Sequence, residues 1–189
     1  ANEQTSIKPL EEKILKEFDC QKFIYCSDAG LGSEKIRKYN HMGERAFVVT
    51  QSIKKLNAQD RQWALDTKGF KRLSDDKVVD LAEISNDDED IYYKDAPYTP
   101  KDLSQRLIIT YSPKYAKYQK TIREKQVDRA KLMLEKGSIK KERRNPNDPA
   151  RFISSLAVTD DGEKANVHNF LNTDKIDEET KYDGMYAVS

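Results

Sequence analysis

A hydrophobic stretch that leads directly into an acidic residue and a glycine turn is the part of this chain best suited to chemistry. Residues 23–26 have the apolar and aromatic character of a strand, and Ser27-Asp28-Ala29-Gly30-Leu31 follows at once. In open α/β sheets, ligands and metals bind in the crevice outside the carboxyl ends of the strands. Asp28 is therefore the first candidate for a catalytic or metal-binding carboxylate. The same pattern is also common in ordinary turns, where it has no chemical role.

The elements predicted around Asp28 are a strand, a short helix and a second strand. Apolar residues at helical spacing predict a first helix over 6–18, and a strand follows at 22–27. Ser33 as cap and Gly43 as stop predict a helix over about 33–42, before another strand over 45–50. This order is typical of a parallel βαβ unit with a right-handed crossover. Such a unit places Asp28 at the edge of the sheet that binds ligands.

The remainder of the chain is predicted to mix short strands with one long helix. Weak strand signals over 78–84, 91–93 and 107–111 indicate a small antiparallel sheet. Ser112 and Pro113 form a strong helix start, and the helical pattern continues to about Glu135. Apolar segments over 152–158, 167–171 and 182–188 complete the chain, with a turn expected at 160–162. The fold class is mixed α/β, or α+β overall.

The long helix combines tyrosines with many basic residues. Tyr111, Tyr115, Tyr118 and Ile122 form one stripe, and much of the remaining surface is lysine and arginine. Lysines among tyrosines can bind a phosphate backbone, because each contact releases a counterion. The alternative is a solvated helix that packs through its tyrosine stripe. The candidate DNA contacts, which include two arginines of a basic loop, are Lys114, Lys117, Arg123, Arg129, Arg143 and Arg144.

Composition limits the partners of the chain. Of its 189 residues 37% are hydrophobic, and 34 Lys and Arg nearly balance 33 Asp and Glu, which leaves a net charge of +1. No global field therefore draws it to DNA or to a membrane, so any nucleic-acid contact must come from local patches. The sequence has no apolar run near the roughly 20 residues of a membrane span, and no signal peptide. A cytoplasmic protein without a membrane partner is predicted.

Several segments together resemble the insertion-sequence DDE transposases of bacteria, in the group whose catalytic domain contains an inserted subdomain. The similarity extends over nearly the whole chain and rests on the order and spacing of the motifs. The helix start at Ser112-Pro113-Lys114-Tyr115-Ala116 also resembles that group. The segments that carry the resemblance are Asn2-Glu3-Gln4-Thr5-Ser6, Leu10-Glu11, Ser27-Asp28-Ala29-Gly30-Leu31 and Lys181-Tyr182-Asp183-Gly184-Met185-Tyr186-Ala187-Val188.

The resemblance implies a ribonuclease H-like fold in which three carboxylates hold two magnesium or manganese ions. Two-metal sites of this kind cut and join phosphodiesters. By resemblance, Asp28 is the second aspartate of the three. The family's first aspartate and its glutamate match no residue here, so we expect a piece of a longer enzyme. It comprises a partial catalytic core (1–50), an insertion subdomain (51–180) and a strand that returns to the core (181–189).

The resemblance also implies partners and an activity. Transposon-end DNA is the expected partner, and self-association is expected in the complete enzyme, since unpaired sheet edges favour it. One carboxylate cannot hold two metal ions against water, so these 189 residues should bind magnesium weakly or not at all. A DNA-nicking assay with magnesium should therefore give no product, and nicking by the purified chain would contradict this expectation.

Two other interpretations remain open from the residues alone. The first is a stand-alone α/β hydrolase in which Asp28 is nucleophile or metal ligand, with Asp183 or Asp160 as helper. The second is a non-catalytic module that binds DNA or a partner through the tyrosine-rich basic helix. Phosphatase or esterase turnover would favour the hydrolase. Salt-dependent duplex binding without turnover fits the module or the transposase piece.

Overall fold

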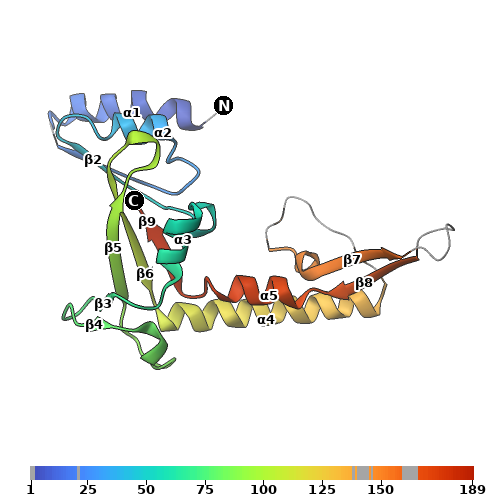
Figure 1. Ribbon diagram of the computed structural model, residues 1–189. Coiled ribbons are helices and arrows are strands. Elements are labelled where there is room, and N and C mark those ends of the chain that lie inside the picture. Colours follow the sequence, from blue (N-terminus) through green and yellow to red (C-terminus); the bar gives the residue numbers. More distant parts are fainter. Residues whose placement is uncertain (1–2, 21, 138, 140–144, 146, 159–165) are drawn as a thin grey trace. The chain divides into compact units, whose positions relative to one another are not determined.

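A computed structural model describes the chain, and its elements form a mixed α+β structure (Figure 1). The described residues are 3–20, 22–137, 139, 145, 147–158 and 166–189. The chain forms two compact units. The first comprises Ala1–Ser85, Glu89–Ser112 and Met185–Ser189, and the second comprises Asn86–Asp88 and Pro113–Gly184. None of the helices described here has the length and apolar character needed to cross a membrane.

The first unit begins with the predicted strand, helix and strand. Helix α1 (Glu3–Glu17) precedes strand β1 (Phe23–Ser27), helix α2 (Glu34–Tyr39) and strand β2 (Arg45–Val49). Strands β1 and β2 pair in parallel, from Phe23 opposite Arg45 to Ser27 opposite Val49, which confirms the predicted parallel pair. The second helix is shorter than expected, because the chain already leaves the helix at Asn40.

A five-stranded antiparallel sheet makes up the rest of the first unit. Its strand order is β4-β3-β5-β6-β9, so the predicted small antiparallel sheet is confirmed and is larger than expected. The strand predicted over 78–84 is limited to Val78–Val79, because Leu81–Glu83 form a turn of 3-10 helix. Tyr92, Phe70, Leu107 and Ile109 are fully buried and supply the largest core side chains. Its strands are β3 (Phe70–Arg72), β4 (Val78–Val79), β5 (Tyr92–Tyr98), β6 (Gln105–Tyr111) and β9 (Met185–Val188). The helix α3 (Ala58–Leu65) and three short 3-10 helices, labelled η, connect them: η1 (Ile53–Lys55), η2 (Leu81–Glu83) and η3 (Pro100–Asp102).

Strand β9 connects the antiparallel sheet to the parallel pair. On one edge it pairs with β6, from Tyr111 opposite Met185 to Ile108 opposite Val188. On the other edge the Val49 and Ser189 amides and carbonyls exchange two hydrogen bonds of 2.9 Å, and the Gln51 amide donates to the Ala187 carbonyl. Both sheets therefore share one hydrogen-bonded framework around β9.

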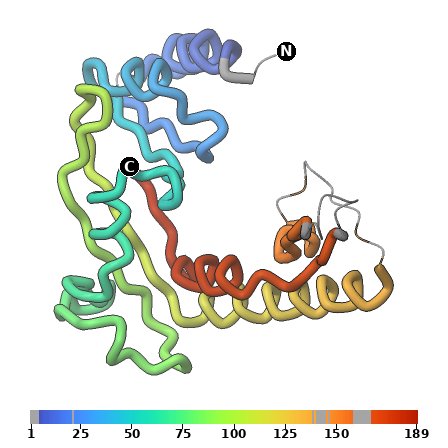
Figure 2. Tube along the Cα trace, turned by 45° about the vertical axis from the view of Figure 1, so that its right-hand side comes forward, coloured from blue at the N-terminus to red at the C-terminus, as the bar shows by residue number. Residues whose placement is uncertain are grey.

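The second unit is built on the long helix α4 (Pro113–Glu135), whose limits match the prediction. Helix α5 (Thr173–Thr180) lies alongside α4 in both views (Figures 1 and 2). Ala130 packs with Phe152 and Ile153 in a small core that also includes Leu171 and Ile176. The remaining elements are η4 (Pro149–Phe152), β7 (Ile153–Val158) and β8 (Asn166–Leu171), and the two strands pair antiparallel.

Some expectations differ from the structure. Helix α5 was not predicted, and the last strand begins at Met185 because Tyr182 and Asp183 belong to the turn that ends α5. The turn expected at 160–162 lies outside the described residues. The two units meet in the chain at both ends of Asn86–Asp88 and at both ends of Pro113–Gly184. The functional division into 1–50, 51–180 and 181–189 stays a prediction.

A buried polar pair joins α1 to α2. Asn40 Nδ2 donates to Glu11 Oε1 over 3.1 Å, and both side chains are almost completely buried. Glu11 Oε2 and Asn40 Oδ1 have no hydrogen-bond partner among the described residues. Burial raises the pKa of Glu11, although Asn40, Arg45 and Lys8 act in the opposite direction. An ionised Glu11 is therefore costly inside this unit.

Glu11→Gln should stabilise the protein at neutral pH. The pKa of Glu11 is higher in the folded protein than the value of 4.5 expected in the unfolded chain. The protonated carboxyl group therefore stabilises the fold below pH 4.5, and this stabilisation is lost as the pH rises through the pKa of the folded protein. The amide can also donate to Asn40. Urea unfolding should show a gain of about 1 kcal/mol at pH 7 and a smaller gain at pH 4.

Glu12→Gln is the matched control, because Glu12 is the exposed neighbour that accepts from the Tyr39 hydroxyl. It should change stability by less than about 0.5 kcal/mol. A Glu11→Gln variant that is less stable at pH 7, or whose gain is equal at both pH values, would contradict the account.

Candidate functional site

Asp28 stands at the carboxyl end of β1, in the turn that leads to α2. Its side chain is exposed, and Oδ1 accepts hydrogen bonds from the amides of Gly30 and Leu31 at 2.9 and 3.1 Å. A Cβ atom at Gly30 would lie 3.2 Å from this oxygen, so glycine allows the tight turn. Oδ2 makes no hydrogen bond within the described part of the chain. One carboxylate oxygen thus faces solvent at the edge where the two parallel strands end.

The residues around Asp28 do not form a metal site by themselves. Among the described residues, no three His, Cys, Asp or Glu side chains gather closely enough to hold a metal ion. Magnesium usually binds through one or two carboxylates together with waters and substrate phosphates, so a lone carboxylate is a weak ligand. Of the two helpers considered for a hydrolase, Asp183 belongs to the second unit and Asp160 lies outside the described residues.

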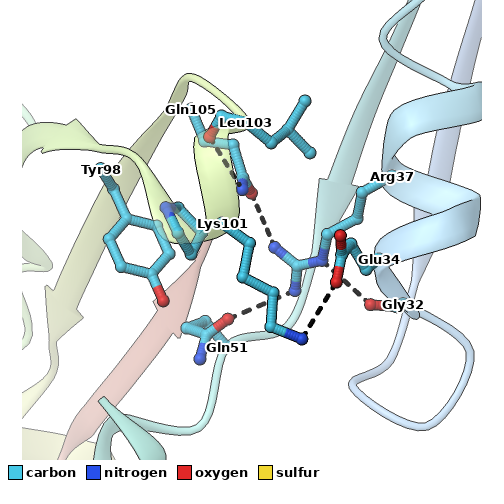
Figure 3. A pocket seen from close by; sticks show the side chains of 9 residues that line it. Gly32, Glu34, Arg37, Gln51, Tyr98, Lys101, Leu103 and Gln105 are labelled. Carbon is cyan, nitrogen blue, oxygen red and sulfur yellow. Dashed lines mark hydrogen bonds and ion pairs between the residues drawn. The ribbon is translucent and has the colours of Figure 1, made fainter. Parts of the chain in front are cut away.

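A pocket of about 230 Å³ begins four residues after Asp28, at Gly32 (Figure 3). Gly32 is required here, since a Cβ atom would lie 2.0 Å from Val49 Cγ1. The walls come from α2, from the segment after β2, and from the β5–β6 connection. The lining residues are Gly32, Glu34, Arg37, Gln51, Tyr98, Pro100, Lys101, Leu103 and Gln105.

The guanidinium of Arg37 occupies the centre of these walls (Figure 3). Arg37 is 9% exposed, and Nε donates to the Gly32 carbonyl at 2.9 Å. Nη1 donates to Gln105 Oε1 at 2.7 Å and to Ser189 Oγ, and Nη2 donates to Gln51 Oε1 at 3.3 Å. Burial lowers the pKa of Arg37. One side chain therefore connects α2 to β6, to the segment after β2 and to the residue after β9.

Glu34 is the carboxylate of the pocket, and two lysines hold it. Its oxygens lie 2.8 Å from Lys38 Nζ and 2.9 Å from Lys101 Nζ. Hydrogen bonds from Lys38 and then Lys101 lower the pKa of Glu34 to about 2. Glu34 therefore stays ionised, and its charge is matched by these two lysines.

The second unit contains the basic face of α4. Lys114, Tyr118, Lys125 and Arg129 are exposed and follow one side of the helix at spacings of four, seven and four residues. The Tyr118 ring stacks on that of Tyr115, with centroids 6.2 Å apart and an interplanar angle of 18°. We call Lys114, Tyr118, Lys125 and Arg129 the α4 stripe. Its tyrosine is 61% exposed, so it does not pack into a core.

The other predicted DNA contacts are placed differently. Lys117 is exposed and lies 3.0 Å from Asp87. Arg123 is buried on the inner side of α4, where its two Nη atoms donate to the two carboxylate oxygens of Asp183 at 2.5 Å each. The prediction that Arg123 faces DNA is therefore not supported. Arg143 and Arg144 lie outside the described residues.

Two functional candidates were missed by sequence reasoning. Lys125 carries a local signal, because it lies eleven residues from Lys114 and so falls on the same side of a helix. Arg37 carries none, because its partners Gln105 and Ser189 are 68 and 152 residues away in the chain. Only the folded sheet brings these groups together.

Comparisons with protein families, with curated proteins and with solved structures gave no significant match. The candidate functional residues of this chain fall into two groups. In the first unit these are the carboxylate at the end of β1 and the pocket around Arg37. In the second unit they form the α4 stripe.

Asp183→Asn should destabilise the second unit strongly. Arg123 and Asp183 are 10% and 15% exposed, so the substitution leaves a largely buried guanidinium without its carboxylate. Removing one partner of a buried ion pair costs about 3 kcal/mol or more. Thermal unfolding measures this effect. Asp177→Asn, at an exposed position of α5, is the control. A loss of stability in Asp183→Asn no larger than in the control would show that the Arg123–Asp183 pair contributes little.

Proposed function

We propose that this chain is a piece of a DDE transposase that contacts transposon-end DNA through the α4 stripe and contributes Asp28 to the catalytic centre. In this proposal the first unit contains part of a ribonuclease H-like core, and the second unit is an inserted DNA-contacting subdomain. A cytoplasmic location is part of the proposal, because the family that the chain resembles is bacterial. Magnesium or manganese belongs to the complete enzyme, whose further ligands come from outside these 189 residues.

The position of Asp28 supports the catalytic part of the proposal. Its carboxylate is exposed at the carboxyl end of a parallel strand, where ligands bind in α/β sheets. Asp28 and strand β9 belong to the same unit, whereas residues 181–184 of the family-like segment that ends in β9 belong to the second unit. Ser189, directly after β9, bonds to Val49 at the end of β2. One unit thus holds Asp28 and the strand in which the last family-like segment ends.

The α4 stripe is the observation that carries the DNA-binding part. Its three cations and its tyrosine are all exposed, whereas the opposite side of α4 is committed to Arg123–Asp183 and to the small core. No described carboxylate forms an ion pair with Lys114, Lys125 or Arg129. Cations of this kind bind phosphates and release counterions, and an exposed tyrosine can stack on a base.

The double variant Lys114→Gln/Lys125→Gln should weaken binding to duplex DNA of any sequence. Each phosphate contact contributes about 0.9 to the slope of log affinity against log salt, so the slope should fall by about 2. Fluorescence anisotropy with a labelled duplex, from about 50 to 200 mM salt, measures it.

Lys120→Gln/Lys131→Gln is the matched control on the same helix. These two lysines are also exposed and also eleven residues apart, but they lie about 120° around the helix from the first pair. The control should keep the affinity for duplex DNA within about twofold of that of the unmodified chain, and it should leave the salt slope nearly unchanged. Equal losses in both double variants would indicate a nonspecific charge effect, and no loss in either would remove the α4 stripe from the proposal.

A further inference from the structure

The buried charge of Arg37 is not matched by an acid. Within the described part of the chain, all its hydrogen-bond partners are neutral, namely the Gly32 carbonyl, two glutamine side chains and the Ser189 hydroxyl. Glu34, the carboxylate of the same pocket, pairs with Lys38 and Lys101 instead. Burying a cation without an anion is costly, and proteins usually pair such charges. The pocket wall therefore contains a positive charge that an anionic ligand would neutralise.

Several hydrogen-bond donors around the pocket remain for such a ligand. A guanidinium has five N–H groups, and the four hydrogen bonds of Arg37 leave one on Nη2. The Tyr98 hydroxyl makes no hydrogen bond among the described residues. Lys101 Nζ has three N–H donors and, among the described residues, bonds only to Glu34. The lining contains two positively charged side chains, Arg37 and Lys101, and one negatively charged side chain, Glu34, so its net charge is +1.

The loop that presents Lys101 is strained. Lys101 and Asp102 have φ values of 50° and 63°, in the left-handed region that disfavours residues with a Cβ. Each such residue costs about 1 kcal/mol or more, and strain of this kind is concentrated at ligand-binding sites. Two adjacent strained residues therefore hold a lysine at the mouth of a pocket with a buried arginine.

We infer that the Arg37 pocket binds a phosphate group. The donors Arg37, Lys101 and Tyr98 surround it, and its volume of about 230 Å³ lies below the range of about 300–1,000 Å³ that is typical of pockets for drug-sized molecules. A phosphate group fits this site better than a whole nucleotide. The source is either a free phosphate ion or, if the proposed function holds, a phosphate of the DNA backbone beside the Asp28 turn.

Titration of the 189-residue chain with inorganic phosphate tests the inference. The Arg37 Nε–H signal in ¹⁵N NMR spectra should shift and saturate at millimolar phosphate, with chloride at equal ionic strength as reference. Lys101→Gln should weaken this binding by about fivefold or more, because one cation of the pocket is lost. Tyr98→Phe, which keeps the ring, should weaken it by about twofold or more.

Lys38→Gln is the control for Lys101→Gln. Both lysines bind Glu34, but only Lys101 lines the pocket. Lys38→Gln should leave phosphate affinity within about twofold. The inference is overturned if the Arg37 signal does not saturate, if Lys101→Gln binds like the unmodified chain, or if both lysine variants lose affinity equally.

A second experiment distinguishes the two sources of phosphate, and it also distinguishes the proposed role of the α4 stripe from that of the Arg37 pocket. If the ligand is a DNA phosphate, a short duplex should compete with inorganic phosphate at the Arg37 signal, and Lys101→Gln should weaken duplex binding. If the ligand is a free phosphate ion, inorganic phosphate should bind and the short duplex should not compete with it at the Arg37 signal. The Lys114→Gln/Lys125→Gln variant should still bind inorganic phosphate, so failure of the α4 stripe and failure of the pocket give different results.

Discussion

The hydrogen bonds on both edges of strand β9 hold the first unit together. One edge continues the antiparallel sheet through β6, and the other bonds to the chain from Val49 to Gln51. The parallel pair β1–β2, which is small by itself, is thereby attached to a five-stranded sheet. Two-stranded sheets are marginally stable in isolation, so the position of Asp28 depends on a segment more than 150 residues further along the chain.

The same constraint shapes the Arg37 pocket and the insertion of the second unit. Because β9 lies beside the end of β2, Ser189 reaches Arg37, and the guanidinium joins four parts of the first unit. The pairing of Tyr111 with Met185 also brings together the two ends of Pro113–Gly184, the longer of the two segments that form the second unit. A long insertion between two paired strands leaves the sheet intact, which is compatible with the DNA-contacting role that we propose for the second unit.

Local sequence patterns predicted α4 and the parallel strand pair but not α5, whereas the long-range pairs had to be seen in the structure. Ser112-Pro113 predicted the start of α4, and the strand, helix and strand around Asp28 form the expected parallel pair. Arg123 looked like its basic neighbours on α4, but its partner Asp183 is 60 residues away. Arg37 likewise has partners that are distant in the chain, Gln105 and Ser189. A single sequence gives no signal for such partners, because helix periodicity identifies a buried side without identifying what covers it.

The central claim is that Asp28 is one of three carboxylates that act together in the complete enzyme. The most direct measurement is to sequence the coding region on both sides of these 189 residues. The account predicts, in the same reading frame, an upstream strand that ends in an aspartate and a downstream helix with a glutamate in a Tyr-Arg-Glu-Lys spaced motif. A reading frame that closes without either acid would contradict it, and Asp28 would then be only the residue that caps a turn.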